Sequence, residues 1–470
     1  MYSQLKHIHF IGIGGIGMSA LARYFLKSGK TVSGYDKVRS EITDALQNEG
    51  AQVYFEERTD FVKLLTDKYD ENELLPVYTP AIPANHAELQ FLHSIKHTIK
   101  KRAEVLGIIT SGAKTLAVAG THGKTTTTTL LAHLLKSSGK NVSAFLGGIS
   151  NNYGTNLLLG NPLSETDEHF VVVEADEYDR SFLHLKPYIS IVTATEPDHL
   201  DIYGTEQEML NAYAEFVNQI SAQGALVYNR NATQINLNNA TCTQLSYSIR
   251  NNADAIATNI HIAKGLYVFD YNFNDVKYDR LKLGLPGRHN VENAVAAITA
   301  ATLVGLKEFD IRVGLESFNG VGRRFQKQLQ SEKLVVIDDY AHHPTEVQAC
   351  LSSVKELYIG KKITAVFQPH LFSRTKDFHK EFAAALSLAD QVLLMDIYPA
   401  RELPISGVSS AMILEHITSA QKQLVHANSV TSELLNNHGD VVVFMGAGNI
   451  ELLVKPFCKA WLQKEKEVLS

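Results

Sequence analysis

The sequence predicts an α/β protein of three domains: a Rossmann-like N-terminal domain, a central P-loop domain with a mostly parallel sheet, and a Rossmann-like C-terminal domain. At 470 residues the chain is too long for a single hydrophobic core. Glycine-containing loops twice follow an apolar strand and precede a helix, and strands alternate with helices again in the last third of the chain. The predicted domains cover residues 1–110, 111–325 and 326–470.

Composition argues against several classes of protein. Hydrophobic residues make up 45% and charged residues 20%, as in ordinary globular proteins, and the net charge of −6 gives no reason to expect nucleic acid as a partner. No stretch reaches the ~18 apolar residues of a membrane span, and residues 1–10 lack the layout of a signal peptide. Three distant cysteines (Cys242, Cys350 and Cys458) indicate buried thiols in a reducing compartment. We therefore expect a cytoplasmic protein without a membrane partner, either a monomer or a weak homodimer.

The first domain opens with a predicted strand, His7–Ile13, and a helix at 18–28. Between them a G-x-G-x-x-G pattern is formed by Gly12, Gly14, Gly15 and Gly17. The next strand, Thr31–Tyr35, ends at Asp36, where dinucleotide folds carry a ribose-binding carboxylate. This motif alone favours NAD, but it fits any nucleoside diphosphate, because glycines and a helix N-terminus recognise phosphates. The alternative is that the glycines serve only tight helix–strand packing.

The central domain begins with a strand at 116–119, and Lys124 opens a helix that runs to about Ser137. The loop between them consists of Gly120, Thr121, His122 and Gly123. Backbone N–H groups at a helix N-terminus bind phosphates, Lys124 supplies a cation for the β- and γ-phosphates, and the Thr125 hydroxyl can ligate Mg²⁺. Thr126 belongs to the same predicted ATP site. The loop is shorter than the full G-x-x-x-x-G-K-[ST] pattern, so an ordinary strand-to-helix turn with a solvated lysine is the alternative.

Two further strands of this domain end in polar residues. The strand at 170–174 ends in Glu174, which can hold Mg²⁺ opposite Thr125. Three more acids follow within Ala175–Asp179, and some of them are expected to form a solvent-exposed rim. The next strand, at 188–195, precedes His199, which either binds metal or the transition state or is structural. Because ligand sites lie outside the carboxyl ends of parallel strands, we expect Lys124, Thr125, Glu174 and His199 at one edge.

Cations recur where the central domain ends. Arg288, His289 and Asn290 precede a predicted helix at 291–304, where they contact a phosphate or a base edge, or else act as caps. Both interpretations stay open. The run 320–324, which ends in Arg323 and Arg324, is typical of a hinge carrying two cations.

In the third domain, polar side chains gather after successive strands. The strand at 334–337 precedes Asp338–Pro344, and the strand at 363–367 precedes Gln368-Pro369-His370. Further strands are predicted at 392–395 and 441–444. Packing does not require the side chains of His342, His343, His370 and Arg374. Metal binding by the histidines is one interpretation, but the sequence around them lacks the pattern of carboxylates and spacing that is typical of a metal site. The more economical interpretation is that Arg374 binds a carboxylate through two parallel hydrogen bonds.

Taken together, these stretches resemble the Mur ligases, the ATP-dependent amino-acid ligases of peptidoglycan synthesis. The resemblance covers nearly the whole chain through IHFIGIGGIGMSALA, AVAGTHGKTTTT, VVEADEYDRSFL, PDHLDIYG, GRHNVENA, GVGRRFQ, DDYAHHPTE, FQPHLFSRT and DIYPARE. It implies three domains, for the UDP moiety, ATP and the amino acid, and thus UDP rather than NAD in the first. Leu371 departs from the arginine expected in many relatives. Residues 213–217 offer no lysine for carbamylation, as expected for the alanine-adding branch.

The resemblance also implies the reaction and its residues. ATP, with Mg²⁺, would convert the carboxylate of UDP-N-acetylmuramate to an acyl phosphate that L-alanine attacks. Lys124, Glu174 and His199 are the implied catalytic residues, with Mg²⁺ on Thr125, Glu174 and His199. ATP would also contact His289, Asn293 and Arg324, and the implied amino-acid site consists of Tyr340, His342, His370 and Arg374. The UDP-sugar site consists of Gly12, Gly14, Gly15, Gly17 and Asp36.

Three other functions fit parts of the sequence. A murein-peptide recycling ligase would join a tripeptide to the same sugar nucleotide and shares EADEYD and AHHPT. A P-loop regulatory ATPase would bind protein partners instead. An NAD-dependent dehydrogenase follows only from Gly12–Gly17 and leaves the loop before Lys124 unexplained.

Overall fold

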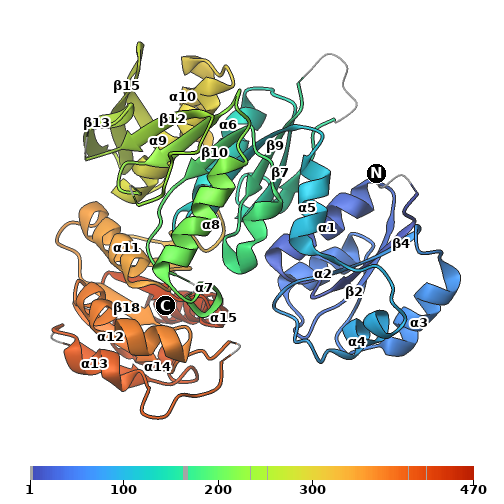
Figure 1. The fold of residues 1–470 in the computed structure, drawn as a ribbon. Helices are drawn as coiled ribbons and strands as arrows, with labels where there is room; N and C mark the ends of the chain where they lie inside the picture. Colours follow the sequence, from blue (N-terminus) through green and yellow to red (C-terminus); the bar gives the residue numbers. More distant parts are fainter. Residues whose placement is uncertain are drawn as a thin grey trace. The chain divides into compact units, whose positions relative to one another are not determined.

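The computed structural model describes residues 4–161, 168–198, 200–232, 234–250, 252–400, 402–419 and 421–469. The chain divides into two compact units. The first comprises Met1–Thr258, Asp270–Leu281 and Glu292–Phe318, and the second Asn259–Phe269, Lys282–Val291 and Asn319–Ser470. Each contains parallel strands covered by helices, so the predicted α/β class is confirmed (Figure 1). No described helix is both long and apolar enough to cross a membrane.

The N-terminal sheet is fully parallel, with strand order β3-β2-β1-β4-β5. Its strands are β1 (His7–Ile11), β2 (Thr31–Tyr35), β3 (Gln52–Tyr54), β4 (Leu74–Tyr78) and β5 (Lys100–Lys101). Its helices are α1 (Ile16–Lys27), α2 (Glu41–Asn48), α3 (Thr59–Lys68), α4 (Ala87–Ser94) and α5 (Arg102–Thr110). The strand order reverses between β1 and β4, which makes the carboxyl end of this pair the expected ligand position.

The second sheet has ten strands in the order β15-β14-β13-β12-β11-β10-β6-β9-β7-β8. These are β6 (Lys114–Ala119), β7 (Val142–Ser150), β8 (Thr155–Leu158), β9 (Phe170–Glu174), β10 (Ile189–Val192), β11 (Ala225–Asn229), β12 (Thr243–Ser248), β13 (Ala255–Ala263), β14 (Leu266–Phe273) and β15 (Val276–Leu283). The run from β7 through β9, β6, β10, β11 and β12 to β13 is parallel, as predicted, and β8 pairs antiparallel with β7. The accompanying helices are α6 (Lys124–Ser137), η1 (Tyr178–His184), α7 (Leu200–Tyr203), α8 (Glu206–Asn218), α9 (Arg288–Leu303) and α10 (Glu308–Ser317).

One apolar core joins these first two sheets. It runs from Phe25 on α1 and Val105 on α5 to Phe145 on β7 and Phe216 on α8. A buried amide strengthens the junction, since Asn156 Nδ2 donates to the Ile16 carbonyl at 2.7 Å. The N-terminal sheet and the phosphate loop of the second sheet are therefore held in one packed body.

The C-terminal sheet has the order β16-β17-β21-β18-β19-β20, parallel except for β16. Its strands are β16 (Gln326–Gln330), β17 (Val335–Asp339), β18 (Ile363–Phe367), β19 (Gln391–Met395), β20 (Gln421–Val425) and β21 (Val441–Met445). Its helices are α11 (Pro344–Leu357), α12 (Phe372–Leu386), α13 (Ala411–His416), α14 (Val430–Asn436) and α15 (Glu451–Leu469). Alternate residues of the buried strands face two separate cores, as expected for a sheet covered on both sides.

Candidate active site

The loop between β6 and α6 has the conformation of a phosphate cradle. Gly123 is the N-cap of α6 at φ 77°, and Gly120 lies at φ 131°. A Cβ atom on Gly120 would lie 2.1 Å from Thr193 Oγ1, so no larger residue fits beside the end of β10. Thr121 N also donates to the Ala194 carbonyl at 3.0 Å. The loop is thus pinned to the segment that follows β10.

Lys124 does not lie free in solvent. Its Nζ donates to the Gly120 carbonyl at 2.6 Å and to Glu177 Oε1 at 2.7 Å. The side chain of Lys124 is 14% exposed and that of Glu177 only 1%. Glu177 belongs to the acidic run of which some members were expected on a solvated rim, and its burial shows that it is not one of them. Sequence reasoning missed Glu177 as a site residue.

Charges around this pair decide its ionisation. Burial acts to lower the pKa of Lys124, but the carboxylates of Glu177, Glu174 and Asp176 outweigh it and raise that pKa overall. Lys124 therefore remains an ammonium at neutral pH. Burial raises the pKa of Glu177, and the facing ammonium opposes that rise.

Glu174 ends β9, next to β6 in the sheet, with Val118 as its register partner. Its carboxylate lies against the backbone of β7, because a Cβ atom on Gly147 would be 1.9 Å from Glu174 Oε2. Thr125, the second residue of α6, is buried. Carboxylates and a hydroxyl are the hard oxygen donors that Mg²⁺ takes, so these residues fit the ion. His199, the third predicted ligand, lies outside the described residues.

The predicted ATP residues fall in different places. His122 Nε2 lies 3.2 Å from Glu196 Oε2, just beyond β10. Asn293 lies at the phosphate loop, since a Cβ atom on Gly123 would be 2.5 Å from Asn293 Oδ1. His289 belongs to the second unit, where burial lowers its pKa to about 4. Helix α9 already begins at Arg288, so Asn290 does not cap it.

Arg324, the remaining predicted ATP residue, also lies in the second unit. Its guanidinium carbon lies 5.1 Å from the centroid of the Tyr340 ring, and its Nη1 is 3.8 Å from Glu346 Oε1. It therefore stands beside the residues predicted to bind the amino acid.

The glycine turn of the N-terminal sheet lies at the reversal of strand order. Gly12 has φ 92°, and a Cβ atom on it would lie 2.8 Å from Thr79 Cγ2, just beyond β4. Gly14 N donates to Asp36 Oδ2 at 2.7 Å, so Asp36 braces the turn. Helix α1 starts at Ile16 with Gly15 as N-cap, two residues before the predicted start. The strand correspondingly ends at Ile11, because Gly12 turns the chain.

A cavity of about 200 Å³ connects this turn with Glu174. It is lined by Gly15, Ile16, Gly17, Met18, Ala20, Leu21, Thr79, Arg102, Leu106, Phe145, Leu146, Gly147, Glu174 and Asp176. Gly15 and Gly17 of the predicted sugar-nucleotide site and Glu174 of the predicted metal site thus line one cavity. No sequence motif predicts this cavity, because it depends on how α1 packs against β7.

Three of the four predicted amino-acid residues come together beyond β17 and β18. The ring centroid of His342 lies 5.3 Å from that of Tyr340 and 5.8 Å from that of His370. Tyr398, which follows β19 and was missed, stacks on His370 at 5.8 Å. The motif DIYPARE was its only sequence signal. Arg374, the fourth predicted residue, is buried on the first turn of α12.

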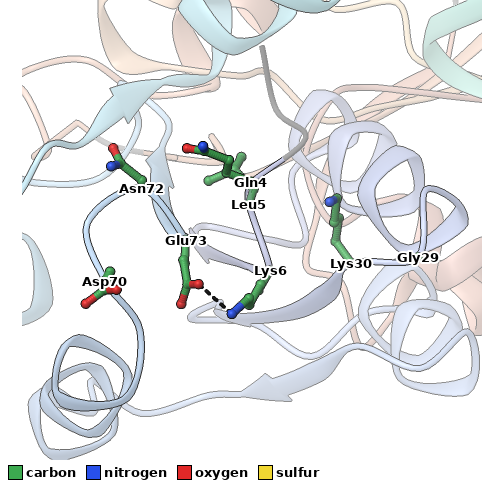
Figure 2. Close-up of a pocket in the computed structure, with 8 residues that line it drawn as sticks. All are labelled: Gln4, Leu5, Lys6, Gly29, Lys30, Asp70, Asn72 and Glu73. Atoms are coloured by element: carbon green, nitrogen blue, oxygen red, sulfur yellow. Dashed lines mark ion pairs between the residues drawn. The ribbon is translucent and has the colours of Figure 1, made fainter.

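Another depression lies at the amino ends of β1, β2 and β4 (Figure 2). Lys6 and Glu73, which precede β1 and β4, form an ion pair at 2.5 Å across it. Ligands of parallel sheets bind at the opposite, carboxyl ends. We therefore assign the candidate site to the cavity at Glu174.

Comparisons with known proteins cover nearly the whole chain. The model described as "Mur ligase family, catalytic domain" matches residues 7–114, "Mur ligase middle domain" matches 118–301, and "Mur ligase, glutamate ligase domain" matches 323–448. The chain is 48% identical to a UDP-N-acetylmuramate–L-alanine ligase of Porphyromonas gingivalis, covering 98% of this chain and 99% of that protein. It is 45% identical to the enzyme of that name from Flavobacterium johnsoniae, covering 96% and 97%.

Solved structures agree with the sequence relatives. The UDP-N-acetylmuramate-alanine ligase of Thermotoga maritima superposes with a TM-score of 0.81 at 28% identity, covering 97% of this chain and 99% of that one. A murein peptide ligase from Psychrobacter arcticus has a TM-score of 0.71 at 23% identity, covering 97% and 98%, which shows a shared fold.

Proposed function

The chain belongs to the Mur ligase family, and from this premise we propose that it joins L-alanine to the carboxylate of UDP-N-acetylmuramate at the expense of ATP, in the cytoplasm. The observation that carries the proposal is the 48% identity, over nearly the full length of both chains, to a ligase of that name. The geometry supports it, because the glycine turn and Glu174 line one cavity and Lys124 lies near Glu174.

The reaction must first activate a carboxylate, because a carboxylate does not react with an amine at neutral pH. A carboxylate oxygen of the sugar nucleotide attacks the γ-phosphorus of ATP, the bond to the β,γ-bridging oxygen breaks, and ADP leaves. The alanine nitrogen then attacks the carbonyl carbon of the acyl phosphate, loses a proton, and inorganic phosphate departs. Both steps concentrate negative charge on phosphoryl oxygens, so positioning and charge neutralisation are what the protein must supply.

The residues of the site divide these tasks. The N-terminus of α6 and the Lys124 ammonium hold the β- and γ-phosphates, for which Lys124 must exchange Glu177 for phosphate. Thr125 and Glu174, with His199, would hold Mg²⁺, and the bound ion would neutralise charge on the phosphates. Asn293, His289 and Arg324 remain the proposed contacts of the nucleotide.

The other two substrates have their own residues. We propose that the diphosphate of the sugar nucleotide lies at Gly12, Gly14, Gly15 and Gly17, with Asp36 bracing the turn. Tyr340, His342 and His370 form the proposed amino-acid site, and Arg374 pairs with the amino-acid carboxylate.

Release of phosphate from ATP tests this proposal. The assay combines UDP-N-acetylmuramate and Mg²⁺ with L-alanine, glycine, L-serine, the tripeptide L-alanyl-γ-D-glutamyl-meso-diaminopimelate, or no amine. We expect turnover to require the sugar nucleotide and to be fastest with L-alanine. Preference for the tripeptide would indicate a recycling ligase, turnover without the sugar nucleotide a regulatory ATPase, and micromolar NAD binding in calorimetry a dehydrogenase-type site.

A further inference from the structure

The cavity that joins the glycine turn to Glu174 has an uneven charge. Among the described residues that line it, Glu174 and Asp176 are acids and Arg102 is the only cation. The proposed substrate brings a diphosphate and a carboxylate, and both are anions. A single guanidinium in such a cavity is therefore the side chain most able to select where an anion rests.

Arg102 lies at the carboxyl edge of the N-terminal sheet, after its outer strand β5. It is the first residue of α5, directly after Lys101, which ends β5 and pairs with Tyr78 of β4. This places Arg102 beyond the carboxyl edge of the sheet, on the same edge as Gly12 and Thr79. Ligands of such sheets bind there, so Arg102 stands at the ligand position of the N-terminal domain.

The guanidinium also touches the glycine turn. A Cβ atom on Gly17 would lie 2.7 Å from Arg102 Nη1, so the missing side chain of Gly17 makes room for the arginine. Gly17 is the second residue of α1, and its N–H is among those that a helix leaves without an intrahelical partner. Two kinds of donor, a guanidinium and helix-terminal amides, thus converge at one place.

Asp176 holds this guanidinium in position. Arg102 Nη2 donates to Asp176 Oδ2 at 3.0 Å, and the arginine side chain is 16% exposed. The adjacent Lys101 makes a comparable pair, with Nζ 2.7 Å from Asp179 Oδ2, but Lys101 does not line the cavity. Only one of these two neighbouring cations is therefore placed to meet a ligand.

We propose that Arg102 binds the diphosphate of the sugar nucleotide together with the amides of the glycine turn, and that Asp176 is its positioning residue. This inference rests on the proposed function. The diphosphate is favoured over the substrate carboxylate because Arg102 Nη1 lies against Gly17, at the positive end of α1. The acids Glu174 and Asp176 repel a further carboxylate on the side of the cavity that they line.

Calorimetry with the full-length protein tests the proposal, with UDP and UDP-N-acetylmuramate as probes. Arg102→Gln should raise the Kd of both about 10- to 100-fold, the usual effect of a lost charge-assisted hydrogen bond, and leave ATP binding unchanged. Arg102→Lys keeps the positive charge but lacks the planar guanidinium with its paired donors, so its loss of affinity for both probes should be intermediate. Lys101→Gln is the matched control, which should change neither Kd more than twofold.

Each other outcome contradicts the proposal. Unchanged UDP affinity in Arg102→Gln would remove the diphosphate contact, and a loss confined to UDP-N-acetylmuramate would assign Arg102 to the carboxylate instead. An equal loss in Lys101→Gln would show that the ion pairs of Lys101 with Asp179 and of Arg102 with Asp176 matter only for packing. If the wild type turns over L-alanine and binds UDP, these failures concern Arg102 alone. If it binds neither probe, the proposed function fails as well.

Discussion

Gly147 offers a way to move Glu174 without mutating it. A Cβ atom on Gly147 would lie 1.9 Å from Glu174 Oε2, 2.3 Å from Cδ and 2.5 Å from Oε1. Non-bonded atoms rest about 3.5 Å apart, so in Gly147→Ala the carboxylate has to retreat by at least about 1 Å. The backbone accepts alanine, because Gly147 is not among the glycines with positive φ.

The expected cost is functional rather than structural. The displaced atoms end a flexible side chain, so the loss of stability should stay near 1 kcal/mol. A shift of about 1 Å in a group that positions the reaction can cost about 100-fold in rate. We therefore expect kcat to fall about 100-fold and the Mg²⁺ concentration for half-maximal rate to rise, with little change in melting temperature.

The assay is phosphate release at saturating substrates over a titration of Mg²⁺, alongside thermal unfolding. Gly112→Ala is the control, because a Cβ atom on Gly112 meets nothing within 4 Å. A kcat for Gly147→Ala within about threefold of wild type, at unchanged Mg²⁺ dependence, would refute the assignment of Glu174. A large fall in melting temperature would refute the inference that the side chain can retreat.

Three further variants test other parts of the site. Lys124→Ala should abolish ligation while UDP binding persists, because an oriented charge is worth several kcal/mol in the transition state; retention of more than about a few per cent of kcat would contradict this. Arg374→Lys should raise KM for L-alanine about 10- to 100-fold, and a pure kcat defect would exclude the carboxylate contact. Burial raises the pKa of Asp338 from 3.8 to about 6, so the stability it contributes is present below pH 3.8 and lost as pH rises to 6. Between pH 4 and 7, the stability of Asp338→Asn relative to wild type should therefore rise by about 2 kcal/mol. Urea unfolding followed by the fluorescence of Trp461, the only tryptophan, measures this stability. A stability difference between the two proteins that does not change with pH would contradict the prediction.

Local signals were enough to predict much of the fold. Helix α6 spans Lys124–Ser137 as predicted, because an apolar strand, a glycine turn and a helix-forming run follow one another in the sequence. Glu174 was predicted at the ligand edge because alternating strands and helices imply a parallel sheet, in which strand ends share an edge.

What the sequence did not predict depends on contacts between distant segments. Glu177 lies inside an acidic run, and its side chain is buried where it pairs with Lys124, 53 residues away in sequence. Arg102 meets Asp176 only because α5 packs near η1, 74 residues away in sequence. Neither residue type nor spacing carries that information.

The ion pair between Lys124 and Glu177 is better explained by its effect on the charge of Lys124 than by a contribution to the stability of the fold. A buried pair loses about as much in desolvation as it gains in attraction, so it is weak evidence for a stabilising role. Burial by itself acts to lower the pKa of Lys124, and a neutral amine would not attract phosphate. The nearby carboxylates of Glu177, Glu174 and Asp176 reverse that effect. The acidic run after β9 thus keeps the lysine charged in a largely buried position, where one ammonium has a greater effect on a phosphoryl group than it has in water.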